Sequence, residues 1–148
     1  MKKIVILLAI SIFILPTNSS ANRVKVFGNV FVSIVDDNKD PTWVRENDKQ
    51  PKYPSAMAIA NLRGCAIISF DVNPLGRTEN MKAIAMMPSR KIASEARVAI
   101  RKWKWVNQKN DEAKEVESKT VRIDYCIGGS STEESNKLCK KQSERQCK

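Results

Sequence analysis

The residues of this sequence with the most specific chemistry are its four cysteines, Cys65, Cys126, Cys139 and Cys147. An even number of cysteines fits two disulfide bridges in an oxidising compartment and two thiol pairs in a reducing one. The chain contains no histidine, which excludes Ser-His-Asp and Cys-His sites and removes the commonest metal ligand and general base. Because there is no C-x-x-C motif either, we expect neither a redox-active pair nor a metal site, and no cofactor.

Positive charge is the second chemical feature. The chain has 26 Lys and Arg against 16 Asp and Glu, a formal net charge of +10 in 148 residues. On a helical wheel of residues 88–105, four cations share one face, namely Arg90, Arg97, Arg101 and Lys104. Such a face can meet anionic lipid or lipopolysaccharide, but a charged helix face is most often simply solvated. We expect no nucleic-acid partner, and the anion-binding interpretation stays open as an alternative.

No pattern typical of an enzyme accompanies these residues. The sequence has no Gly-rich phosphate loop, no nucleophile elbow and no carboxylate pair with convincing spacing. With 42% hydrophobic residues, the chain can form one modest core. We therefore expect a small basic binding protein and not an enzyme.

The N-terminus has the layout of a secretory signal. Lys2 and Lys3 precede twelve residues, 4–15, in which Ser11 is the only polar one, and small residues end the segment at Ala21. This pattern predicts a signal peptide over 1–21 that is cleaved before Asn22. Because a membrane span needs about 20 apolar residues, the run is too short for an anchor. We expect export to the periplasm, with secretion as an alternative, and no membrane span after cleavage.

The elements that must position these residues follow from hydrophobic periodicity. Alternating apolar residues predict a strand or hairpin in 22–35, followed by a linker that extends the N-terminal region to residue 50. The domain proper spans 51–127, with a short helix up to about Leu62, strands at 65–72 and 77–86, an amphipathic helix at 88–105 and a closing strand at 120–127. Residues 128–148 are predicted to form a solvated polar tail.

Four local motifs stand in order within 51–127. They are Pro51-Lys52-Tyr53-Pro54, the strand that Gly64 opens, the turn glycine Gly76, and an alanine-rich helix that ends in Lys102-Trp103-Lys104-Trp105. Together with the closing strand they resemble the C-terminal domain of the TonB energy-transducer family. The resemblance implies a two-layer α+β domain, with a small antiparallel sheet packed on helices and, in this chain, an extra N-terminal strand or hairpin. It also implies a non-catalytic module that binds an envelope protein or peptide.

The chain departs from that family's pattern outside the domain. A full transducer carries an uncleaved N-terminal anchor and a long proline-rich spacer, whereas this sequence has a removable signal and few prolines before Tyr53. We therefore expect an isolated domain that does not couple an inner-membrane motor to a partner by itself.

In the resembled family, the closing strand lies at a sheet edge and receives a receptor peptide by strand addition. This implies a partner-binding segment made of Thr120, Val121, Arg122, Ile123, Asp124 and Tyr125. Arg122 and Asp124 are expected to flank the peptide while the apolar residues pack beneath. A structural, self-associating component of an envelope assembly is the alternative.

The same arrangement suggests how the cysteines pair. If the closing strand lies antiparallel beside strand 65–72, Cys65 and Cys126 meet on the outward face, as a cross-strand bridge requires. We therefore predict Cys65–Cys126, with Cys139–Cys147 closing the tail locally.

Overall fold

The computed structural model of the chain describes residues 26–36, 38–46, 51–109 and 115–148. The predicted signal segment and its cleavage point lie outside these residues. Along the chain the described elements are β1 (Phe31–Ile34), β2 (Trp43–Arg45), α1 (Ser55–Ile59), β3 (Gly64–Val72), β4 (Thr78–Met87), α2 (Arg90–Ile100), β5 (Trp105–Asn107), β6 (Glu117–Tyr125) and α3 (Thr132–Ser143).

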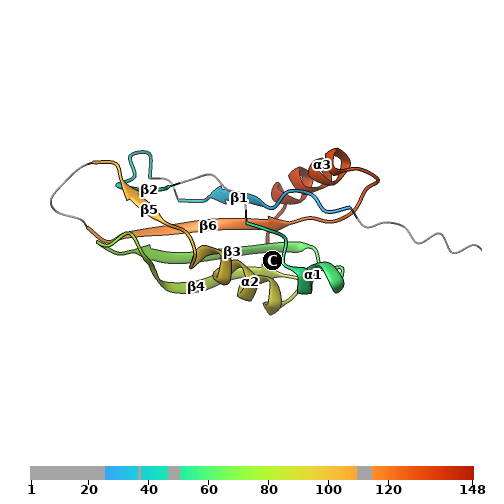
Figure 1. Cartoon of the computed structure of the whole chain (residues 1–148), viewed down its shortest axis with the longest axis horizontal. Helices are drawn as coiled ribbons and strands as arrows, with labels where there is room; N and C mark the ends of the chain where they lie inside the picture. Colours follow the sequence, from blue (N-terminus) through green and yellow to red (C-terminus); the bar gives the residue numbers. More distant parts are fainter. Residues whose placement is uncertain (1–25, 37, 47–50, 110–114) are drawn as a thin grey trace, which may run out of the picture.

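A four-stranded antiparallel sheet with the strand order β1-β6-β3-β4 forms the centre of the protein (Figure 1). The long central strands β3 and β6 pair without interruption from Gly64 opposite Tyr125 to Val72 opposite Glu117. A separate two-stranded ribbon joins β2 to β5. The segment expected to be a linker therefore contains β2, and β5 begins at Trp105, the last residue of the predicted helix.

The core lies between one face of the sheet and α2. Alternate residues of β3, among them Ile68 and Phe70, and of β6, among them Ile123, are buried on this face. Helix α2 covers them with Ile92, Ala93, Ala96 and Ile100, which recur at helical spacing. The predicted α+β class and the extra N-terminal strand are confirmed. The helix ends at Ile100, however, before the end predicted from the sequence.

The C-terminal segment is not a solvated tail. Residues 132–143 form α3, and Ser131 caps its first turn by accepting a hydrogen bond from the Glu134 N–H at 3.2 Å. The Glu134 carboxylate in turn accepts from the Ser130 N–H at 2.7 Å, one residue before the cap residue that a capping box would use. Low apolar content had predicted a solvated segment. The helix nevertheless buries Ser135 and Cys139 completely.

The disulfides pair differently from the prediction. They join Cys65 to Cys147 and Cys126 to Cys139, with Cα–Cα distances of 5.8 and 5.2 Å. Cys65 and Cys126 do lie on the same face of the sheet, but the register places Cys65 opposite Asp124. Helix α3 lies against this face, opposite α2, and brings Cys139 and Cys147 to the two strand cysteines. It thereby adds a third layer at one end of the sheet (Figure 1).

Candidate functional site

Strand β6 contains the predicted partner-binding segment, and it is an interior strand. It pairs with β3 along one side and with β1 along the other, where Val121 to Asp124 face Ile34 to Phe31. The prediction that the closing strand is a sheet edge is therefore wrong, because the N-terminal segment of the same chain folds back beside it. Val121, Ile123 and Tyr125 are buried in the core, as predicted.

Strand β1 holds its place on β6 with few contacts. It pairs with four residues of β6, whereas β3 pairs with all nine. The Val35 N–H extends the pairing by donating to the Thr120 carbonyl oxygen at 2.9 Å. Val30 is buried, but Ile34 is 62% exposed. The chain's own strand thus covers the expected peptide position with limited burial.

Arg122 and Asp124 do not flank an open edge. The Arg122 guanidinium donates to both Asp124 carboxylate oxygens, at 2.7 and 2.9 Å, and the Asp124 side chain is only 1% exposed. The same guanidinium donates to the carbonyl oxygens of Gln142 at 3.0 Å and of Arg145 at 2.6 Å. This buried ion pair attaches the C-terminal end of α3 to the sheet, so neither side chain is free to select a partner.

The opposite edge of the sheet is β4, which is poorly suited to strand addition. Its register with β3 shifts twice, between Ile67 and Ile68 and between Ser69 and Asp71. Asn80 has a φ of 53°, a left-handed conformation. Such bulges twist an edge away from a regular ladder, and the exposed Lys82 adds a charge, which is how natural sheets protect their edges.

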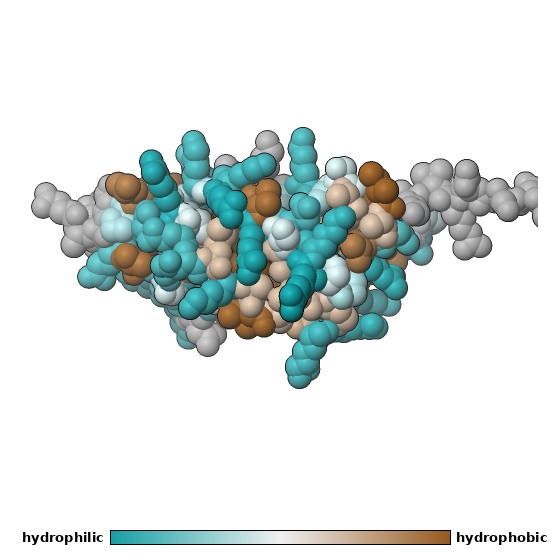
Figure 2. Space-filling model, turned by 90° about the horizontal axis from the view of Figure 1, so that it is seen from below, coloured by the Kyte–Doolittle hydropathy of each residue, from teal (hydrophilic) through white to brown (hydrophobic). Residues whose placement is uncertain are grey.

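The predicted basic face is not a single strip on one helix. Arg90 and Arg101 are exposed on and beside α2, Arg97 is partly buried, and Lys104 lies beyond the end of the helix. The Lys104 carbonyl oxygen accepts from the Glu46 N–H at 2.9 Å. Figure 2 shows hydrophilic side chains spread over this side of the molecule among separate hydrophobic ones. Only Arg90 and Arg97 therefore lie on α2 itself, while Arg101 and Lys104 follow it.

Tyr53 of the Pro51–Pro54 motif packs against Tyr125 of β6. The rings of Tyr53 and Tyr125 are 5.8 Å apart at an interplanar angle of 78°, and the Tyr53 hydroxyl donates to the Leu62 carbonyl oxygen. Burial raises the pKa of Tyr53 to about 12, although the charge of Arg63 acts in the opposite direction. Burial also raises the pKa of Tyr125, and the negative charge of Glu95 adds to this effect.

These shifts predict an alkaline titration with little phenolate near the ordinary tyrosine pKa. The chain has only these two tyrosines, so near-ultraviolet absorbance reports both. Since the folded pKa of Tyr53 is raised, its stabilising effect is complete below about pH 10 and is lost as the pH rises through about 12. We expect phenolate absorbance to rise only above about pH 11, together with unfolding measured by circular dichroism. Half-ionisation near pH 10 in a folded chain would contradict the prediction.

Within the part of the chain that the structure describes, no three His, Cys, Asp or Glu side chains are grouped so that they could hold a metal ion. No helix among these residues is long and apolar enough to cross a membrane. The candidate site is instead the backbone of β6 along Val121 to Asp124, which the short strand β1 covers. The fold and this site define a domain of the protein-interaction class.

Comparison with known proteins identifies the family. The model of the Gram-negative bacterial TonB protein C-terminal family matches residues 49–127, more than half of the chain. The chain therefore belongs to the TonB C-terminal family.

Individual relatives match over shorter stretches. Protein TonB of Klebsiella pneumoniae is 30% identical over 56 residues, and that of Salmonella typhimurium is 32% identical over the same length. Each match covers 38% of this chain and 23% of the relative, so the matched stretch spans less than a quarter of those proteins. The solution NMR structure of the Pseudomonas aeruginosa TonB C-terminal domain is 18% identical, with a TM-score of 0.46, and the match covers 60% of this chain and 88% of that one.

Proposed function

We propose that this protein is a non-catalytic, periplasmic module that binds a peptide segment of an envelope protein, such as an outer-membrane protein. In this proposal the peptide lies beside β6 in place of β1. Family membership supports the class of function. The arrangement of β1 and β6 supports the position, because an exchanged strand would satisfy the same backbone donors and acceptors that β1 now satisfies.

The observation that carries the proposal is the limited pairing of β1. Within β1 itself four residues are paired and the C-terminal end is exposed, while the residues before it are held separately by the Phe27–Ile127 bridge and by the Gly28 N–H bond to the Cys126 carbonyl oxygen. Elements with few buried contacts open at the lowest free-energy cost. The β6 strand itself stays in place meanwhile, because all nine of its residues remain paired with β3.

Two proline substitutions in β1 test strand exchange. Because the Val35 N–H points to β6, the period of a strand directs the Ser33 N–H to β6 as well and the Ile34 N–H away from it. Ser33→Pro removes a donor to β6, whereas Ile34→Pro leaves the pairing intact, and both side chains are exposed. We expect Ser33→Pro to raise the affinity for peptides selected from a random displayed library by about tenfold, because more of the protein is then open. Ile34→Pro should change the affinity less than twofold.

Amide hydrogen exchange of the bound protein provides the second readout. Peptide binding should speed exchange in residues 31–34 while residues 120–125 stay protected. Circular dichroism of both variants checks that the sheet remains folded. If Ile34→Pro abolishes binding while Ser33→Pro does not strengthen it, the peptide adds to the outer edge of β1 and strand exchange is wrong.

Self-association is the second candidate function, because the outer edge of β1 has no neighbouring strand among the described residues and Ile34 and Val35 are 62% and 48% exposed there. A pair of such edges could join two copies of the chain. Sedimentation over a range of concentrations distinguishes this candidate, since only self-association raises the mass with concentration.

A further inference from the structure

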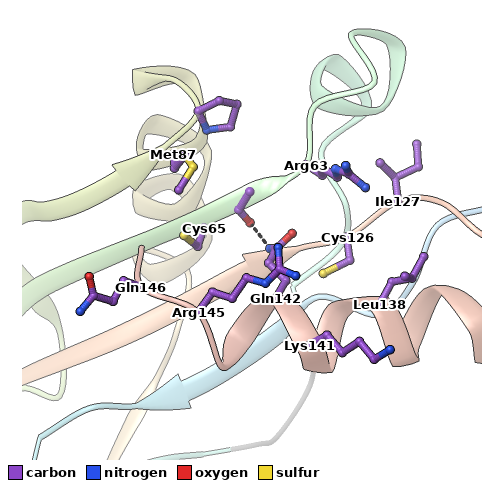
Figure 3. A pocket seen from close by; sticks show the side chains of 12 residues that line it. Arg63, Cys65, Met87, Cys126, Ile127, Leu138, Lys141, Gln142, Arg145 and Gln146 are labelled. Atoms are coloured by element: carbon purple, nitrogen blue, oxygen red, sulfur yellow. Dashed lines mark hydrogen bonds between the residues drawn. The ribbon is translucent and has the colours of Figure 1, made fainter. Parts of the chain in front are cut away.

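A groove lies between α3 and the ends of β3 and β4, away from the β1 position (Figure 3). Its volume is about 560 Å³, within the range of small-molecule sites. Its walls come from the segment before β3, the end of β4, the segment after β6 and one side of α3. All of α3 lies outside the stretch that matches the TonB family, residues 49–127, so one wall of the groove comes from outside the matched domain.

The charged groups around the groove have one sign. Arg63 reaches it from the segment before β3, and Lys141 and Arg145 reach it from α3 and the residues that follow (Figure 3). No acidic side chain lines the groove. All three cations are exposed, and none of them forms an ion pair with a described residue. The groove is therefore complementary to an anionic group.

Apolar side chains lie beside these cations, while the side chain of Gln142 lies between them (Figure 3). Ile127 is almost fully buried, while Met87 and Leu138 are 39% and 40% exposed and face the groove. A simple inorganic anion would leave these apolar side chains in contact with water. Exposed cations by themselves bind such an anion weakly. A ligand with an alkyl chain would cover Ile127 and Leu138 and gain affinity from the apolar area that it removes from water.

Apart from the three cations, which can only donate, the groove offers few side-chain hydrogen-bond partners to a peptide backbone. The side-chain amide of Gln142 already donates to the Gly64 carbonyl oxygen at 2.8 Å and to Asp124 at 3.1 Å. Gln146 is the other amide side chain that lines the groove. Backbone groups buried here without partners would lose their hydrogen bonds to water, which disfavours a peptide relative to an alkyl chain.

Both disulfides hold the groove in shape. Cys126 and Cys65 line it, and their partners Cys139 and Cys147 attach the middle of α3 and the segment after it to the sheet. The wall that carries Lys141 and Arg145 is thus fixed before a ligand arrives. Such preorganisation reduces the ordering cost of binding.

We propose that this groove binds a single-chain anionic amphiphile, a carboxylate or phosphate head group on an alkyl chain. The head group lies among Arg63, Lys141 and Arg145, and the chain lies over Ile127 and Leu138, on one side of these cations (Figure 3). This site is separate from the β1 position and does not depend on the function proposed above.

Isothermal titration of the purified protein with dodecanoate, below the concentration at which it forms micelles, tests the site. We expect one molecule to bind per chain. The double variant Lys141→Gln with Arg145→Gln should weaken binding by about tenfold or more, the effect of losing about 1.4 kcal/mol. Lys140→Gln is the matched control, because Lys140 is exposed on the same helix but does not line the groove. It should change the affinity less than twofold.

Leu138→Ala tests the apolar part, and its expected effect is about three- to tenfold weaker binding of dodecanoate with no change for acetate. In NMR spectra, the methyl signals of Ile127 and Leu138 should shift on titration while that of the distant Leu75 stays unchanged. Acetate binding as tightly as dodecanoate, an acidic peptide binding more tightly than dodecanoate, or equal losses in Lys140→Gln and in the double variant would each overturn the proposal.

Discussion

Replacing Arg122 by leucine is expected to lower the free energy of unfolding by about 3–5 kcal/mol. Asp124 is fully buried, and Arg122 supplies two of its hydrogen bonds. Without the guanidinium, the carboxylate stays in the interior with Gln142 as its remaining side-chain partner. Helix α3 and the segment after it each lose one hydrogen bond to the sheet. Urea denaturation followed by circular dichroism measures the loss.

Two further variants show whether the uncompensated charge causes this loss. Arg122→Leu combined with Asp124→Leu should be more stable than Arg122→Leu alone, because a buried ion pair replaced by apolar side chains is often nearly neutral. Asp40→Asn is the control at an exposed ion pair, where Asp40 is 87% exposed beside Lys109. It should cost less than about 1 kcal/mol. A double variant no more stable than the single one would show that lost hydrogen bonds, not the buried charge, dominate.

Removing the Cys65–Cys147 bridge with alanine at both positions is expected to cost about 4–5 kcal/mol. The bridge joins residues 82 positions apart, so it restricts the unfolded chain over more than half of its length. It also holds the segment after α3 against β3. The free energy of unfolding under non-reducing conditions measures the effect, and non-reducing peptide mapping verifies which cysteines are joined.

The second bridge is a natural control for this prediction. Cys126 and Cys139 are only 13 positions apart, so alanine at both should cost about 3 kcal/mol, less than loss of the longer bridge. Because the shorter bridge fixes the middle of α3, its loss should expose α3 amides to exchange before those of β6. If the shorter bridge contributes more stability than the longer one, restriction of the unfolded chain is not the main effect.

The sequence by itself determined the elements whose signal is local. Periodicity predicted a strand at 65–72, which is β3, and an amphipathic helix at 88–105, which contains α2. Motifs within 51–127 predicted the family. Each of these patterns repeats within one element, because the sheet or helix buries one face and side chains follow the period of the backbone.

The sequence also contains a local signal for α3 that amino-acid composition does not reveal. Ser131 followed three residues later by Glu134 is the sequence pattern of a capping box, and it predicts the first turn of α3. The low apolar content of residues 128–148 predicted a solvated tail in spite of this signal. Two disulfides and the Arg122–Asp124 pair attach α3 to the sheet, so the helix needs little apolar surface of its own.

Only the tertiary structure decided which segments lie side by side. It placed β1 beside β6, made the predicted edge an interior strand and shifted Cys126 out of register with Cys65. It also brought Arg63 and Arg145 to one groove from opposite parts of the chain. Periodicity reports which face of a strand is buried. The backbone hydrogen bonds that join neighbouring strands are the same for nearly every residue type, so the residues of one strand do not show which strand will lie beside it. Strand order and cysteine pairing therefore depend on how the whole chain packs.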